Sequence, residues 1–180
     1  MNWYDTGHME TLSRSQKYIS EFVYGAIDGT VTTFAIVSGV VGAGLSPGII
    51  LILGISNVLA DGWSMASSDY LSSRAEAATT GVTDEGKQPI HSAIVTFLSF
   101  VTIGFIPLLP FVIATFSPFF ASYGWVLSIL FTGVAFIIIG SIRGRISGES
   151  KFRASLETVA VGALAALIAY GVGSLLSGIA

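Results

Sequence analysis

Residues 95–116 read VTFLSFVTIGFIPLLPFVIATF, and this stretch decides the fold because it contains no charged residue. Its apolar residues do not alternate with polar ones, as they would in a transmembrane strand of about 10 residues. A helix needs about 20 mostly apolar residues to cross a bilayer, and it satisfies its backbone hydrogen bonds within its own segment. The stretch therefore predicts a membrane-spanning helix.

Similar runs occur along the rest of the chain. Of its 180 residues, 52% are hydrophobic and only 11% are charged, so lipid must solvate most of the chain. The predicted spans are residues 22–43, 48–72, 90–115, 119–142 and 156–178. We therefore expect an all-α membrane protein with a cytoplasmic tail, residues 1–18, and one five-helix transmembrane domain, residues 19–180. The first run is too long for a cleaved signal peptide, so we interpret it as a permanent span.

The positive charges predict the orientation of the chain. All eight Lys and Arg residues fall on one side of the predicted membrane, at Arg14, Lys17, Arg74, Lys87, Arg143, Arg145, Lys151 and Arg153. The opposite connections, residues 43–47 and 116–119, contain none. The positive-inside rule then places the N-terminus in the cytoplasm and the C-terminus on the other side.

Four acidic residues lie within or at the ends of the first two runs: Glu21, Asp28, Asp61 and Asp69. A carboxylate near the middle of a membrane costs about 2.5 to 3.5 kcal/mol on insertion scales, so each needs a partner, a proton or a water-filled cavity. Asp28 lies 16 residues before Gly44 and Asp61 lies 14 residues after Pro47, which places both about 21 to 24 Å from the outer surface. These two carboxylates can share one layer.

One face of the second run is polar and suits a metal ion. The face consists of residues that recur at helical spacing: Asn57, Asp61, Met65, Ser68 and Ser72. Ser64 and Asp69 lie at its margins. A thioether beside carboxylates is a mixed soft and hard ligand set, which suits a first-row divalent metal better than Na⁺ or Mg²⁺. The candidate metal ligands are Asp28, Met65, Asp61, Asn57, Asp69 and Glu21.

The first run also contains a seam of small and acidic residues. The seam consists of Glu21, Gly25, Asp28, Thr32, Ala35, Gly39 and Gly42. Small residues allow helix backbones to approach closely, and five spans cannot divide into two equal repeats within one chain. We therefore expect a homodimer in which the first helices of two subunits pair at this seam.

Structural explanations exist for several of these residues. Asp28 and Asp61 could be buried acids that are merely protonated, or bonded to the facing Thr32 or Asn57. Asp69 and Glu21 lie near the membrane–water interface, where a structural role is as reasonable as a role in transport. We assign Glu157 to the favourable N-terminal end of the fifth helix rather than to a metal site. The prolines of residues 106–110, IPLLP, predict a kink in the third helix.

Two segments carry a family resemblance: EFVYGAIDGTVTTFAIVSGVVGAGLS at residues 21–46 and ISNVLADGWSMASSDYLSSRAE at residues 55–76. They resemble the vacuolar iron transporter family, with its DG-x-VTTFA motif in the first helix and N-x-x-AD-x-x-SM-x-x-x-[DE]Y-[LV]-S pattern in the second. The resemblance implies a five-helix dimer that exports Fe²⁺ or Mn²⁺ from the cytosol, in exchange for protons, between the first helices of the two subunits. It also implies that Asp28 and Met65 are pathway ligands.

The chain departs from that family in one place. Eukaryotic members carry a long, Glu- and Met-rich helical domain between the second and third spans, where it collects metal. Here the connection is only residues 74–89, with Glu76, Asp84 and Glu85 as its acids. The short form favours the plasma membrane of a prokaryote over a vacuolar membrane.

Two other functions compete with metal export. Two aspartates at one depth could form an intramembrane aspartyl enzyme, but Asp28 lies in GAIDGT and Asp61 in VLADGW rather than in a GxGD motif. A passive cation channel also needs a polar pathway, so the sequence does not separate it from an antiporter. A structural membrane protein is a further alternative. As partners we expect divalent metal ions, the lipid bilayer and a second copy of the chain, with no nucleic acid and no cofactor.

Overall fold

The computed structural model describes residues 18–80 and 88–179. Its elements are α2 (Ile19–Gly42), α3 (Pro47–Thr80), α4 (Pro89–Gly104), the 3₁₀ helix η2 (Ile106–Leu108), α5 (Leu109–Ala114), α6 (Pro118–Ile146) and α7 (Lys151–Leu176). Five helical segments in the described part of the chain are long and apolar enough to cross a membrane. The predicted five-helix fold is confirmed, while the tail of residues 1–18 lies outside the described residues apart from Tyr18.

The helices extend beyond the predicted apolar runs. α3 continues to Thr80 because residues 72–80, SSRAEAATT, are rich in helix-forming Ala, Arg and Glu. Its 34 residues correspond to about 51 Å of helix, against about 30 Å of hydrocarbon core. The last turns of α3 therefore project from the membrane.

The third span is broken where its prolines predicted a kink. α4 ends at Gly104, the chain forms one 3₁₀ turn that contains Pro107, and α5 follows with Pro110 in its first turn. Proline removes a backbone donor and clashes with the preceding turn. Ser128 of α6 donates a 2.7 Å hydrogen bond to the Pro107 carbonyl oxygen, which satisfies one backbone group at the break.

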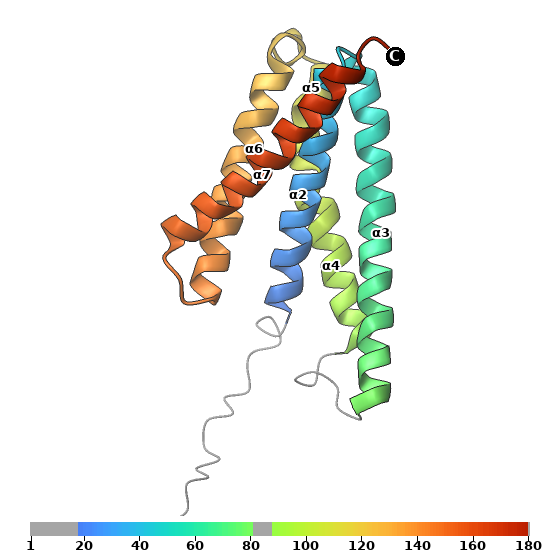
Figure 1. Ribbon diagram of the computed structural model, residues 1–180, viewed down its shortest axis with the longest axis vertical. Helices are drawn as coiled ribbons and strands as arrows, with labels where there is room; N and C mark the ends of the chain where they lie inside the picture. The colour runs from blue at the N-terminus through green and yellow to red at the C-terminus, as the bar shows by residue number, and fades with distance from the viewer. Residues whose placement is uncertain (1–17, 81–87, 180) are drawn as a thin grey trace, which may run out of the picture.

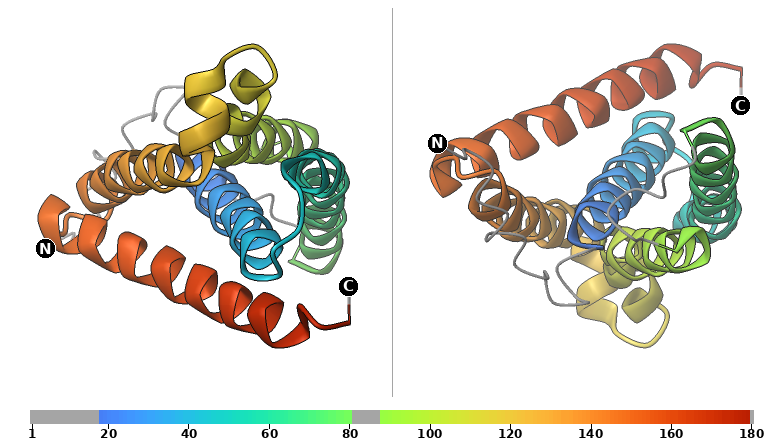
Figure 2. Two further views of the ribbon diagram at one scale, coloured as in Figure 1. Left: turned by 90° about the horizontal axis from the view of Figure 1, so that it is seen from above. Right: turned by 90° about the horizontal axis from the view of Figure 1, so that it is seen from below.

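Helix α2 lies in the middle of the bundle, and it packs against α3, α4, α6 and α7 (Figures 1 and 2). Half of the most apolar 18-residue stretch of α2 is buried, against 6% of the corresponding stretch of α7 at the edge of the bundle. The outer helices expose large apolar side chains, such as Leu167 of α7, which is 69% exposed. An apolar surface of this kind suits lipid.

Close contacts at glycine join α2 to neighbours of the same chain. A Cβ atom added at Gly29 would lie 2.5 Å from the carbonyl oxygen of Phe100 on α4, so no other residue fits there without a shift. Within the seam of small residues, Gly25 abuts α4, while Gly39 and Gly42 abut α7. Close approach at this seam was predicted correctly, but at these three glycines the partner helix belongs to the same subunit. The homodimer itself stays a prediction.

The basic residues gather at one end of the bundle. Arg74 lies near the end of α3, Arg143 and Arg145 in the last turn of α6, and Lys151 and Arg153 in the first turn of α7. All three helix ends point toward the lower part of the molecule in Figure 1, with the end of α3 on one side and the turn between α6 and α7 on the other. Arg14, Lys17 and Lys87 lie outside the described residues. The segregation of the described charges agrees with the predicted topology, and the direction in which that end faces stays a prediction.

Candidate functional site

Two intramembrane carboxyl groups lie near each other on adjacent helices. Asp28 on α2 and Asp61 on α3 are both half-buried. The charge of Asp61 acts electrostatically on Asp28. This interaction agrees with the shared depth predicted from the positions of the two residues in their spans.

The side chains that could have neutralised these acids are engaged elsewhere or unused. Thr32 donates its hydroxyl hydrogen to the backbone oxygen of Asp28 at 2.8 Å, not to the carboxyl group. The side-chain nitrogen of Asn57 is buried and has no hydrogen-bond partner within residues 18–80 and 88–179. Bonding to Thr32 or Asn57 therefore does not explain why the two acids are tolerated in the membrane.

The polar face of α3 is only partly shielded from its surroundings. Asn57, Asp61 and Met65 follow one another at one-turn intervals and are all half-buried. Ser64 and Ser68, on the same side of the helix, are exposed. An amide, a carboxylate and a thioether thus line one strip of α3 that is not fully buried within the chain.

Asp69 and Glu21 lie nearer the basic end of the bundle and have polar partners. Thr96 of α4 donates a 3.0 Å hydrogen bond to Oδ2 of Asp69. Ser20 donates a 2.9 Å hydrogen bond to Oε2 of Glu21, in the first turn of α2. The Thr96 contact gives Asp69 a structural task, which is to tie α3 to α4.

An ion pair between α6 and α7 was missed by the sequence analysis. Arg143 donates a short hydrogen bond to Oε2 of Glu157, and Arg153 contacts Oε1 of the same carboxylate at 3.3 Å. Since α7 begins at Lys151, Glu157 lies beyond its first turn, and the assignment of Glu157 to the N-terminal end of the helix was wrong. The spacing of four residues between Arg153 and Glu157 was a readable signal, whereas the Arg143 contact depends on the turn between the two helices.

The described part of the chain contains no group of three or more His, Asp or Glu side chains placed to hold a metal ion, and the sequence has no cysteine. Asp28 and Asp61 are two carboxylates, which is fewer than the six or so oxygen ligands that a hard divalent ion prefers. Within one chain, Asn57 and Met65 are the neighbouring groups able to add an oxygen and a sulfur ligand. The remaining positions would fall to water or to a second chain.

A family model described as the VIT family matches residues 19–83 and 77–174. Together these two segments cover nearly all of the described chain, including both candidate carboxylates and Met65.

Several similar proteins are named vacuolar iron transporter. A Toxoplasma gondii protein named vacuolar iron transporter is 48% identical over 62 residues, which are 34% of this chain and 20% of that protein. A Plasmodium berghei protein of the same name is 41% identical over 69 residues, 38% of this chain and 25% of its own length. This chain thus matches a quarter or less of the length of these two relatives.

A longer match is to vacuolar iron transporter 1 of Oryza sativa subsp. japonica, 26% identical over 225 residues that cover 91% of this chain and 87% of the rice protein. The aligned region is longer than the 180 residues of this chain, so the rice protein contains residues that have no counterpart here.

Proposed function

This chain belongs to the VIT family, and on that premise we propose that it carries a divalent transition metal ion, Fe²⁺ or Mn²⁺, out of the cytosol. The relatives named above are transporters, not enzymes, which favours transport over an intramembrane aspartyl reaction. The chain is an integral membrane protein, so its cargo must cross lipid.

One observation carries the proposal: Asp28 and Asp61 are half-buried acids in the apolar spans of two helices that pack together, close enough to interact electrostatically. Two neighbouring carboxylates repel each other, and each is expensive in a low-dielectric environment. A passing divalent cation relieves both costs at once. The arrangement is therefore poorly suited to a structural role and well suited to a transient cation site.

The other groups near these acids favour a transition metal. Met65 follows Asp61 by one helical turn, and its polarisable thioether prefers softer ions than Mg²⁺ or Ca²⁺. Asn57 precedes Asp61 by one turn; its side-chain nitrogen has no hydrogen-bond partner in the described part of the chain, and its amide oxygen can bind a metal ion. We assign Asp28 the largest share of the attraction, Asp61 a contact to the metal or to its ligands, and Met65 a role in selectivity.

A second subunit would complete this ligand set. One chain offers two carboxylates, one amide and one thioether, and a homodimer with α2 near its twofold axis would double them. Glycines of α2 already pack on α4 and α7, so the contact between subunits would use the half-buried side of α2 that contains Asp28, Thr32 and Ala35.

Proton exchange would couple transport to a pH gradient. When a carboxylate in a low-dielectric site releases its metal ion, taking up a proton removes its charge and stabilises it. We therefore propose antiport of metal against protons, with a passive channel as the second candidate. The short connection between α3 and α4 fits a prokaryotic plasma membrane; of its acids, Glu76 is exposed on α3, while Asp84 and Glu85 lie outside the described residues.

Uptake into proteoliposomes tests the proposal. Iron, manganese, calcium and zinc would be compared under a set pH gradient, with protein-free liposomes as the control. We expect uptake of Fe²⁺ and Mn²⁺ that stops when the gradient is abolished. Equal uptake with and without the gradient would instead support a passive channel, and no uptake of any metal by folded protein would reject metal transport.

A further inference from the structure

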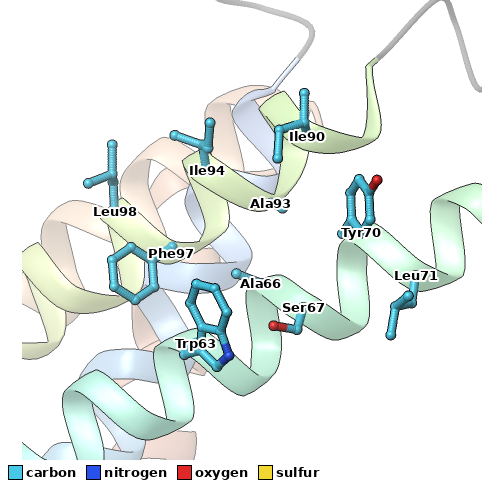
Figure 3. A pocket seen from close by; sticks show the side chains of 10 residues that line it. All are labelled: Trp63, Ala66, Ser67, Tyr70, Leu71, Ile90, Ala93, Ile94, Phe97 and Leu98. Atoms are coloured by element: carbon cyan, nitrogen blue, oxygen red, sulfur yellow. The ribbon is translucent and has the colours of Figure 1, made fainter.

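An apolar groove runs between α3 and α4 on the outside of the bundle (Figure 3). Its volume is about 430 Å³. Trp63 and Tyr70 of α3 line it from one side, and Ile94, Phe97 and Leu98 of α4 from the other. No charged side chain lines the groove.

The groove lies within the membrane and opens outward. Trp63 is 69% exposed and Leu98 is 53% exposed, so the rims of the groove face the surroundings of the bundle. Counted from Pro47, about 20 residues of helix cross a hydrocarbon core of about 30 Å, which places Trp63 in the core and Tyr70 at the headgroup boundary. An occupant of the groove must therefore be apolar along most of its length.

A positive charge stands at the basic end of this groove. The guanidinium group of Arg74 lies over the Tyr70 ring, 5.7 Å from its centroid, and donates a 3.4 Å hydrogen bond to the Tyr70 hydroxyl group. Arg74 is exposed and makes no ion pair with any acid among residues 18–80 and 88–179. From Trp63 to Arg74 the helix rises about 16 Å, which is close to the thickness of one leaflet.

We propose that this groove binds an anionic glycerophospholipid. One acyl chain lies along Trp63, Phe97 and Leu98, and the lipid phosphate receives hydrogen bonds from Arg74 at the boundary. Arginine matches phosphate geometry and also stacks on aromatic rings, so Tyr70 holds the guanidinium group in place.

Charge favours a lipid over a second copy of the chain in this groove. A symmetric contact at α3 and α4 around an axis normal to the membrane would bring two Arg74 side chains to the same depth, where they repel. A lipid phosphate supplies the opposite charge at that position.

Tryptophan quenching by brominated lipids tests the site. The chain has three tryptophans, so Trp3→Phe and Trp125→Phe together leave Trp63 as the only indole, at the rim of the groove. This protein would be reconstituted in phosphatidylcholine vesicles that contain a small fraction of brominated phosphatidylglycerol or, separately, the same fraction of brominated phosphatidylcholine. We expect the anionic lipid to be enriched at Trp63 by about fivefold, the effect of one basic residue at a membrane surface.

Two substitutions, with a third as control, test the headgroup contact and the acyl-chain groove separately. Arg74→Gln should erase the preference, while Arg145→Gln, a basic residue at the same end of the bundle on α6, should keep it. Ser67→Phe, which fills the groove, should reduce quenching by the brominated anionic lipid. Equal quenching by both lipids in the parent, no quenching by either because a second chain covers Trp63, or an unchanged preference in Arg74→Gln would each overturn the proposal.

Discussion

The hydroxyl group of Thr96 on α4 donates a 3.0 Å hydrogen bond to Oδ2 of Asp69 on α3. This contact separates Asp69 from Asp28 and Asp61, although all three are aspartates of the first two spans. Asp69 helps to hold two helices together, whereas the other two interact with each other. These three aspartates therefore differ in their partners although they share a residue type.

Thr96→Val tests the structural role of this contact. Valine keeps the shape of the buried Thr96 side chain but removes the donor to a charged acceptor, which should cost about 1 to 3 kcal/mol. The midpoint of thermal unfolding in detergent should fall. Thr102→Val is the matched control, because Thr102 is exposed on the same helix and bonds only to the backbone of Leu98. Equal midpoints for both variants would show that the contact to Asp69 stabilises nothing.

Two glycines of the spans should respond oppositely to alanine. At Gly29 the added Cβ atom would lie 2.5 Å from a backbone oxygen of α4, so Gly29→Ala should destabilise the protein by about 1 to 3 kcal/mol. At Gly133 of α6 the added atom would meet nothing within 4 Å, so Gly133→Ala should be neutral or stabilising. Thermal unfolding of the two variants checks the packing of α2 on α4, and an unchanged Gly29→Ala protein would contradict it.

The orientation can be measured with single cysteines, because the chain has none of its own. Ser46 and Ser147 are both exposed; they lie in the α2–α3 and α6–α7 connections, which are at opposite ends of the bundle. An impermeant thiol reagent added to intact cells should label Ser46→Cys and leave Ser147→Cys unlabelled, because the positive-inside rule predicts that the basic end faces the cytoplasm. The reverse labelling would invert the topology.

The overall architecture was predictable because each of its determinants is local. Length and hydropathy identify a span, and Pro107 and Pro110 break the third one wherever it lies in the bundle. The second predicted span ends at residue 72 whereas α3 continues to Thr80, because an apolar run marks the membrane and not the end of the helix.

The partners of each residue were not predictable, because they depend on how the helices pack. Gly39 suits a helix contact in any sequence, but only the tertiary structure shows that the contact is to α7. Thr32 looked like a partner for the Asp28 carboxyl group, and instead it bonds to the backbone of its own helix. The pair of Asp28 and Asp61 was found from sequence because depth along a span follows from counting residues.

Met65→Leu tests the thioether. Leucine preserves volume and packing but cannot bind a metal ion. The ratio of manganese to iron transport should therefore be higher in the variant than in the parent. The ratio of Mn²⁺ to Fe²⁺ uptake in proteoliposomes measures this effect independently of protein density. An unchanged ratio would remove Met65 from the pathway.

The central claim is that Asp28 binds the metal in transit, and Fe²⁺ uptake by proteoliposomes containing Asp28→Asn tests it most directly. Asparagine keeps the size and removes the charge, and loss of an expensive intramembrane carboxylate should leave the fold as stable as before or more so. Glu157→Gln is the matched control, because its carboxylate pairs with Arg143 and Arg153 outside the pathway. At equal density of folded protein, uptake should fall to the protein-free level in Asp28→Asn and stay at the parental rate in Glu157→Gln, whereas a parental rate in Asp28→Asn would contradict the account.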